Sequence, residues 1–146
     1  GFMLACDIVI AREEAKFGTP DVNVGLFPMM IGALIFRNLP RKKAMEMVLL
    51  GDRLTAQQAL ELGMLTRVVP ADRLDETVAG ILKTLVGKSP IGLKLGKEAF
   101  YQTADMPFEE ALDLLSQGLK KVIATDDARE GMTAFIEKRK PVFTGK

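Results

Sequence analysis

The sequence predicts an α/β chain in which a few short strands come first and helices make up most of the rest. Short runs of β-branched residues between turn residues occur only before residue 70, whereas apolar residues recur at helical spacing after it. The chain has 146 residues, of which 48% are hydrophobic and 27% charged, so we expect a globular protein that can bury a core.

Composition excludes several classes of function. The net charge is only +1, from 20 basic and 19 acidic residues, which argues against binding to nucleic acid or anionic membranes. No apolar run approaches the roughly 20 residues of a membrane span. The single cysteine cannot form a disulfide within the chain, and the absence of histidine excludes Ser-His-Asp catalysis and histidine-based metal sites built from this chain alone. We therefore expect no metal.

The first 70 residues combine short strands with helices. Residues 7–11, DIVIA, are predicted to form a buried strand, and residues 16–18 a second one. Residues 19–28 have turn residues and no clean period, which predicts a structured loop. Helices are expected at residues 29–39 and 41–50, separated by Pro40 and stopped by Gly51.

Capping signals place the next elements. Thr55 and Gln58 fit a capping box, and Gly63 would end that helix in a left-handed conformation. Residues 65–69 then form a short extended segment. The remainder should be helical: residues 74–85, about 90–101 and 108–122, followed by a helix with a capping-box pattern at Asp127 and Glu130 and basic residues 138–140 at its end.

Asp21 lies in the stretch FGTPDVNVG, which allows two interpretations. A carboxylate held between apolar walls can exchange protons near neutral pH and act as a general acid or base. An aspartate beside a proline in a glycine-rich loop is equally typical of a solvated turn. Local composition by itself favours the turn.

Four segments in series change that balance: ACDIVIA, AKFGTPDVNVGLFP, LLGDRLTAQQALELGMLTRVVP and DDAREGMTAFIEKRKPVF. In this order and at about this spacing they resemble the crotonase (enoyl-CoA hydratase/isomerase) superfamily, in its C-terminal part. The resemblance implies a crotonase-like spiral of ββα units, with the end of the spiral core and an active-site segment in residues 1–70. Residues 71–146 would form a helical region for CoA binding and trimerisation.

The resemblance implies an acyl-CoA thioester as substrate and no cofactor, since coenzyme A is part of the substrate. Members hydrate 2-enoyl-CoA reversibly, and two backbone N–H groups stabilise the enolate-like intermediate. On this alignment both N–H groups lie outside the chain. The two glutamates of the family's hydratases fall on Gly1 and Asp21, so one carboxylate is absent and the other is shortened. An isomerase that uses Asp21 alone, or a non-catalytic CoA-binding or structural subunit, therefore stays an alternative.

Further substrate-binding candidates follow from the resemblance. Gly1 is one of them. Met29, Met30 and Ile31 replace small residues after Pro28, where they would either reshape the acyl pocket or simply fill the helix core. Phe135 and Lys138 match family positions that hold CoA, the ring against adenine and the ammonium against phosphate. They would share one face of a helix, although core packing and a helix-end charge are alternative roles.

The chain starts in apolar sequence without Met, which we interpret as the middle of an element of a longer protein. Its expected partners are the missing N-terminal half of the same protein and further copies in a trimer or dimer of trimers. We expect a cytoplasmic protein without a membrane span.

Overall fold

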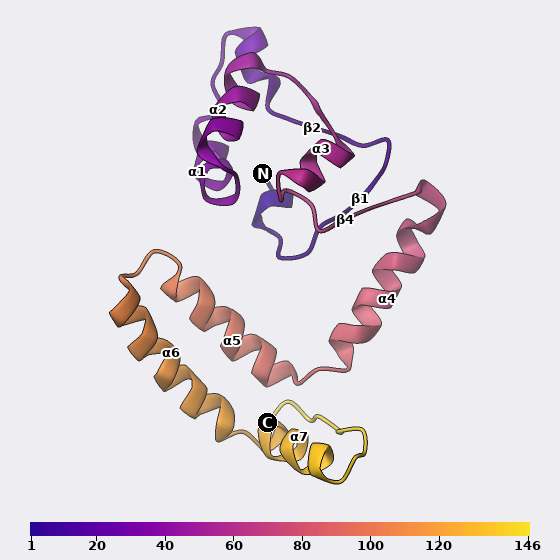
Figure 1. The fold of residues 1–146 in the computed structure, drawn as a ribbon, viewed down its shortest axis with the longest axis vertical. Coiled ribbons are helices and arrows are strands. Elements are labelled where there is room, and N and C mark those ends of the chain that lie inside the picture. Colours follow the sequence, from indigo (N-terminus) through magenta and orange to yellow (C-terminus); the bar gives the residue numbers. More distant parts are fainter. The chain divides into compact units, whose positions relative to one another are not determined.

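A computed structural model describes residues 1–146, and the chain divides into two compact units, residues 1–79 and 80–146 (Figure 1). The boundary falls within helix α4 (Leu74–Val86), so each unit is described by itself. None of the helices is long and apolar enough to cross a membrane.

Two short strand pairs tie distant parts of the first unit together. Strand β1 (Ile10–Arg12) pairs in parallel with β4 (Arg67–Val69), and β2 (Lys16–Phe17) pairs antiparallel with β3 (Leu54–Thr55). The predicted strand at residues 7–11 begins only at Ile10, because residues 7 and 8 form a bend. The pairing partner β3 was not predicted.

The helices of the first unit follow the sequence signals closely. They are η1 (Met3–Ala5), η2 (Pro20–Val24), α1 (Met29–Asn38), α2 (Arg41–Leu50), α3 (Ala56–Glu61) and η3 (Ala71–Arg73). Helix α2 ends at Gly51 with a φ of 64°, as predicted. The capping box of α3 is also confirmed, because the Gln58 N–H donates to Thr55 Oγ1 and the Thr55 N–H donates to Gln58 Oε1.

The core of the first unit lies between α1, α2 and α3. Ile35 of α1 and Met47 and Val48 of α2 are buried apolar side chains at its centre, with at most 3% of their surface exposed. Three alanines, Ala44, Ala56 and Ala59, have no exposed surface and so allow the helices to pack closely. This core is the support on which the segment of Asp21 rests.

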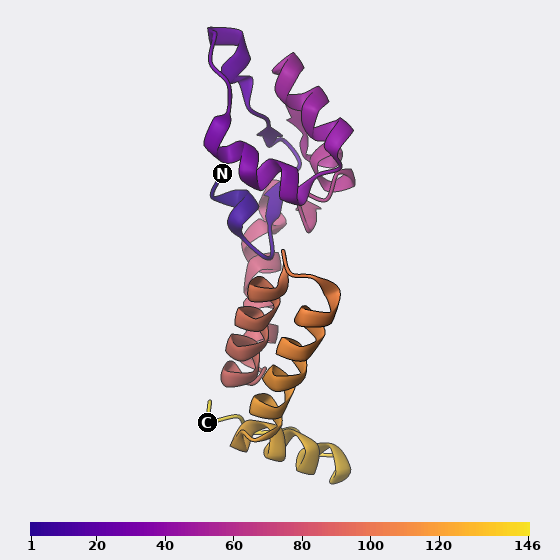
Figure 2. The ribbon, with the colours of Figure 1, turned by 90° about the vertical axis from the view of Figure 1, so that its left-hand side faces the viewer.

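The second unit is helical. Helices α5 (Pro90–Thr103) and α6 (Phe108–Ile123) run side by side in opposite directions, and α7 (Asp126–Ile136) follows (Figures 1 and 2). The predicted N-cap of α5 is confirmed, because Ser89 Oγ accepts a hydrogen bond from the Gly92 N–H at 3.0 Å. The final residues of the chain return along α7 without regular structure.

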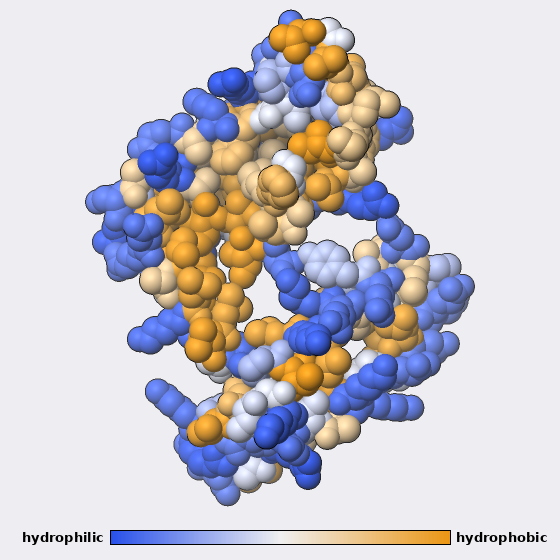
Figure 3. Space-filling view, turned by 180° about the vertical axis from the view of Figure 1, so that it is seen from behind, coloured by the Kyte–Doolittle hydropathy of each residue, from blue (hydrophilic) through white to orange (hydrophobic).

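Apolar side chains remain on the surface of both units (Figure 3). The second unit buries only Asp127 and Ala134. The stripe predicted on α6 is real, but its large side chains stay accessible, with Phe108 at 78% and Leu119 at 59% exposure. This unit therefore has little apolar core of its own.

Candidate active site

Asp21 is placed by a single 3-10 turn. Pro20 occupies the first position of η2, where its missing N–H costs no hydrogen bond. Gly25 closes the turn at a φ of 77°, and its N–H donates to the carbonyl oxygens of Asp21 and Val22. The predicted loop at residues 19–28 is thus a compact turn in its first half, with Asp21 at the second position.

Close contacts hold both sides of this turn against the segment that follows α2. On one side a Cβ at Gly18 would lie 2.7 Å from the carbonyl oxygen of Asp52. On the other side Asn23 Nδ2 donates a hydrogen bond to the carbonyl oxygen of Gly51 at 3.3 Å. A Cβ at Gly51 would lie only 2.8 Å from Asn23 Oδ1 and from Val22. A side chain at Gly18 would collide with backbone, and one at Gly51 would displace Asn23 and Val22, so the position of Asp21 is held from both directions.

The Asp21 side chain is half-buried, and no hydrogen bond or ion pair engages its carboxylate. A turn aspartate would ordinarily accept a hydrogen bond from a nearby backbone N–H. Here the backbone carbonyl of Asp21 is used instead, since it accepts from Leu26 at 3.0 Å. Both carboxylate oxygens are therefore available to a ligand.

Gly1, the position of the other family glutamate, lies beside helix α1. A Cβ at Gly1 would contact Ile31 Cδ1 at 3.6 Å, so a side chain there would lean on α1. Gly1 also lines a cavity of about 230 Å³ together with Thr19 and Ile31. The sequence interpretation named Gly1 and Ile31 but missed Thr19, because a lone hydroxyl side chain gives no chemical signal of its own.

Met29 and Met30 begin α1 and are 77% and 92% exposed. Neither lines this cavity, and the next residue, Ile31, does so in their place. Within the first unit, the structure brings Gly1 and Ile31 together but leaves both methionines outside.

Phe135 and Lys138 lie in the second unit. Phe135 is 85% exposed on the last turn of α7. The prediction that both residues share a helical face is wrong, because α7 ends at Ile136 and Lys138 lies beyond it. Lys138 has a φ of 55°, and it is the only non-glycine residue of the chain with a positive φ.

The conformation of Lys138 belongs to a Schellman motif. The Lys138 N–H donates to the carbonyl oxygen of Phe135, and the Arg139 N–H donates to that of Ala134. Glycine is the usual residue at this position, and it does occupy it at Gly63 after α3. A lysine in this left-handed conformation is sterically less favourable than glycine. The Lys138 side chain makes no ion pair within the chain.

Glu130 holds the segment that follows Lys138. Its two carboxylate oxygens accept hydrogen bonds from the Arg139 guanidinium at 2.6 and 2.9 Å, and one of them also accepts from the Val142 N–H at 2.8 Å. These bonds, from Arg139 first and then Val142, lower the pKa of Glu130 to about 2. Arg139 is held in turn by Glu137 at 2.6 Å.

Asp127 holds the end of the chain. It is 1% exposed, and its carboxylate accepts hydrogen bonds from Ser89 Oγ at 2.7 Å and from the N–H groups of Thr144 and Gly145. Burial would raise the pKa of Asp127, but these bonds outweigh it, so its pKa lies below the ordinary value. The capping-box prediction for Asp127 and Glu130 is wrong, since Thr125 caps α7 and accepts from the Ala128 N–H.

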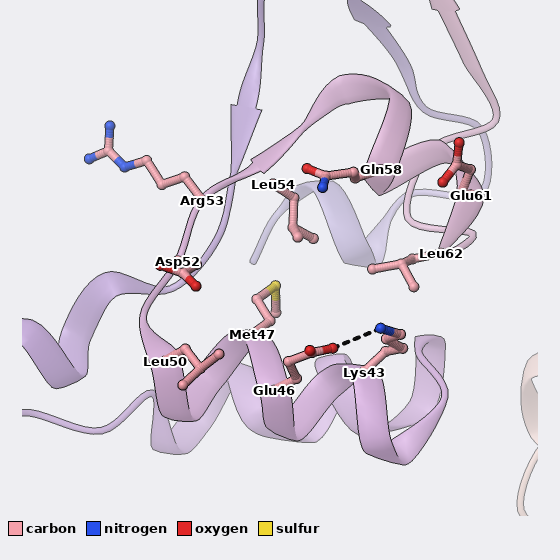
Figure 4. A pocket seen from close by; sticks show the side chains of 10 residues that line it. All are labelled: Lys43, Glu46, Met47, Leu50, Asp52, Arg53, Leu54, Gln58, Glu61 and Leu62. Atoms are coloured by element: carbon pink, nitrogen blue, oxygen red, sulfur yellow. Dashed lines mark hydrogen bonds and ion pairs between the residues drawn. The ribbon is translucent and has the colours of Figure 1, made fainter.

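A larger cavity of about 490 Å³ lies between α2, β3 and α3 (Figure 4). Met47, Leu54 and Leu62 point into it, whereas Arg53 points away. Two of its charged side chains neutralise each other, because Lys43 Nζ lies 2.8 Å from Glu46 Oε2. None of the residues predicted to bind substrate lines this cavity.

Comparison with known proteins agrees with this architecture. Residues 1–146 match the family model described as enoyl-CoA hydratase/isomerase. The human enoyl-CoA hydratase domain-containing protein 3, mitochondrial, is 40% identical over 140 residues, which are 96% of this chain and 46% of that protein. The 2,3-dehydroadipyl-CoA hydratase of Escherichia coli strain K12 is 34% identical over 144 residues, covering 98% of this chain and 56% of the relative.

Solved structures show the same relationship. An enoyl-CoA hydratase from Mycobacterium smegmatis superposes with a TM-score of 0.94 at 32% identity, covering 97% of this chain and 55% of that one. The crystal structure of the human domain-containing protein 3 gives 0.93 at 40% identity, covering 97% and 56%. The chain thus spans about half the length of the relatives it matches. It has the crotonase fold and belongs to the enoyl-CoA hydratase/isomerase family.

Proposed function

We propose that this chain is part of an enzyme that acts on acyl-CoA thioesters, with Asp21 as the carboxylate that moves a proton on the acyl chain. The observation that carries the proposal is the state of Asp21. Its carboxylate is half-buried and unpartnered, on a turn that is held by the close approach of Gly18 to the backbone of Asp52 and of Gly51 to the side chains of Val22 and Asn23. A fixed general base without an internal partner is prepared to take a proton from a ligand.

Enoyl-CoA hydratase-like chemistry is the first candidate reaction. The oxygen of water would bond to C3 of a 2-enoyl thioester while Asp21 accepts the water proton, and the same proton would then be delivered to C2. Because Gly1 offers no carboxylate, Asp21 would serve as base and then as acid. Aspartate is shorter than glutamate by one C–C bond, about 1.5 Å. The turn would therefore have to hold the Asp21 carboxylate closer to the acyl chain than a glutamate would need.

Isomerisation is the second candidate, and the absence of a side chain at Gly1 favours it. Moving a double bond from C3 to C2 needs only one carboxylate, which removes a proton from C2 and returns it to C4. Water takes no part. The two reactions differ in the number of catalytic groups that they require near the acyl chain, and Asp21 by itself would be sufficient for the second.

The CoA part of the substrate would contact the second unit. Lys138 projects from a left-handed backbone position that glycine would occupy at lower cost, and its ammonium has no partner in the chain. Phe135 presents an exposed ring near the same helix end. We therefore keep the assignment of Lys138 to phosphate and Phe135 to adenine as part of this proposal.

The test is to supply the full-length protein with 2-butenoyl-CoA and with 3-hexenoyl-CoA and to follow hydration and isomerisation separately. Asp21→Asn should lower kcat for the true reaction by about 100-fold or more. Asp113→Asn is the matched control, because Asp113 is exposed on α6 and makes no ion pair. Equal rates in wild type and Asp21→Asn would remove Asp21 from the mechanism. Binding of thioesters without any turnover would support the non-catalytic alternative instead.

A further inference from the structure

Ile31 fills space directly beside Gly1. It lies in the first turn of α1, and a Cβ placed on Gly1 would lie 3.6 Å from Ile31 Cδ1 and 3.9 Å from Ile31 Cγ1. Both distances are ordinary van der Waals contacts between carbon atoms. The position that offers no carboxylate is therefore packed against hydrocarbon from the neighbouring helix.

The side chains around this pair offer water little to bind. Gly1 and Ile31 line one cavity, and most of its other side chains are apolar, as Leu4 is. Thr19 also lines it, but its Oγ1 has almost no accessible surface, so water does not reach that atom. Lys16 is the other polar side chain of the lining, and its residue is exposed. A bound water usually needs about two to four polar partners, which these side chains do not supply.

The two candidate reactions differ in their need for water. Hydration adds the oxygen of water to C3 of a 2-enoyl thioester and a proton to C2, whereas isomerisation moves a proton from C2 to C4 and uses no water. The cavity adjoins the segment of Asp21, because Gly18 and Thr19 line it three and two positions before that residue. Walls that exclude water at this place favour isomerisation over hydration.

We propose that Ile31 is a specificity residue whose side chain keeps water away from the acyl chain beside Gly1, so that a 3-enoyl thioester is isomerised and its product is released without hydration. This inference rests on the proposed function, because it takes the ligand to be an acyl-CoA thioester. Asp21 removes the proton from C2, the double bond moves from C3–C4 to C2–C3, and the proton returns to C4. Ile31 takes no part in this transfer and acts only on the access of water.

Product analysis of the full-length protein tests the inference. The protein is supplied with 3-hexenoyl-CoA and, separately, with 2-hexenoyl-CoA, and 2-hexenoyl-CoA and 3-hydroxyhexanoyl-CoA are separated by chromatography. Wild type should isomerise the first thioester faster than it hydrates the second. Ile31→Thr and Ile31→Val give side chains of nearly the same shape, and only threonine adds a hydroxyl that can bind water.

The ratio of hydration to isomerisation should rise about tenfold or more in Ile31→Thr, because the added hydroxyl gives water a partner. It should stay near the wild-type ratio in Ile31→Val. Ile31→Ala opens the same space without adding a polar group, and it should also raise the ratio.

Leu34→Thr is the matched control for packing. Leu34 lies on the same helix, is half-buried and packs against the same core as Ile31, but it does not line the cavity. Leu34→Thr should therefore lower Tm about as much as Ile31→Thr does and leave the product ratio unchanged. The ratio thus reports on the site, whereas Tm reports on the core.

The possible failures are distinguishable. The inference is overturned if wild type hydrates 2-hexenoyl-CoA faster than it isomerises 3-hexenoyl-CoA, or if neither Ile31→Thr nor Ile31→Ala changes the ratio. It is also overturned if Leu34→Thr changes the ratio as strongly as Ile31→Thr. In each of these cases the thioesters are still turned over, so the proposed function stands. If wild type converts neither thioester, the proposed function itself is wrong.

Discussion

Asn23 is joined to Gly51 by a hydrogen bond from its side-chain amide to the Gly51 carbonyl oxygen, at 3.3 Å. The two residues also pack closely, because a Cβ placed on Gly51 would lie only 2.8 Å from Asn23 Oδ1. The end of α2 and the turn that carries Asp21 are therefore interlocked. A change at Gly51 must move one of them.

Gly51→Ala should destabilise the protein and lower activity together. The substitution places a methyl group in the left-handed conformation, at a cost of about 1 kcal/mol, and also pushes Asn23 and Val22 away. Gly63→Ala is a matched control, since Gly63 has a φ of 78° but no atom within 4 Å of its Cβ direction. Denaturant unfolding should show a larger loss for Gly51→Ala, and only that variant should lose kcat. Equal losses in both would show that the interlock has no effect.

Helices were predictable because their signals are local. The capping box at Thr55 and the glycine stops at Gly51 and Gly63 depend only on residues within the same turn. Strand β3 was not predictable in this way, because Leu54 becomes a strand only by pairing with Phe17, far away in the sequence. The shortened β1 has the same origin, since it pairs only where β4 lies beside it.

The candidate site was predictable only in part. The position of Asp21 came from a motif, and its unpartnered carboxylate agrees with the proposed role without testing it. Thr19 has no motif of its own and becomes visible only when burial and hydrogen bonding are known. Glu130 was read as a cap, because its true partners, Arg139 and Val142, reach it only after the chain has turned back.

Lys138→Gly should separate binding from stability. Glycine adopts the left-handed conformation at φ 55° without the steric cost that lysine bears, so Tm should stay unchanged or rise. If Lys138 binds a CoA phosphate, the Kd for acyl-CoA should rise about tenfold, and added salt should reduce the difference. Lys140→Gly serves as the charge control. An unaltered Kd in Lys138→Gly would mean that Lys138 does not contact the ligand.

Acid should release the end of the chain from α7. The pKa of Glu130 is lowered from about 4.5 to about 2, so its stabilising bonds are fully present above about pH 4.5 and are lost as the pH falls toward 2. The lowered pKa of Asp127 acts in the same direction. In thermal unfolding from pH 7 to pH 2, the Tm of wild type should exceed that of Glu130→Gln at neutral pH. This difference should shrink as the pH falls from about 4.5 toward 2. A constant difference between the two proteins across the range would contradict this assignment.

Glu130→Gln should also affect binding more than chemistry. Glutamine cannot form the charged pair with Arg139, so the backbone turn at Lys138 should become less well held. KM for the thioester should rise while kcat changes little, because Asp21 lies in the other unit. Glu109→Gln, on an exposed face of α6, is the control that should alter neither constant.

The helical unit should associate with further copies. It buries only Asp127 and Ala134, while large apolar side chains of α6 such as Leu119 are more than half exposed. A unit with so little core gains stability when that surface is covered, and the trimer or dimer of trimers predicted from the family resemblance would cover it. Light scattering on the full-length protein should report a multiple of three chains. Leu119→Glu should reduce that mass, whereas Lys120→Glu on the neighbouring exposed position should not. A stable monomer that keeps full thermal stability would contradict this prediction.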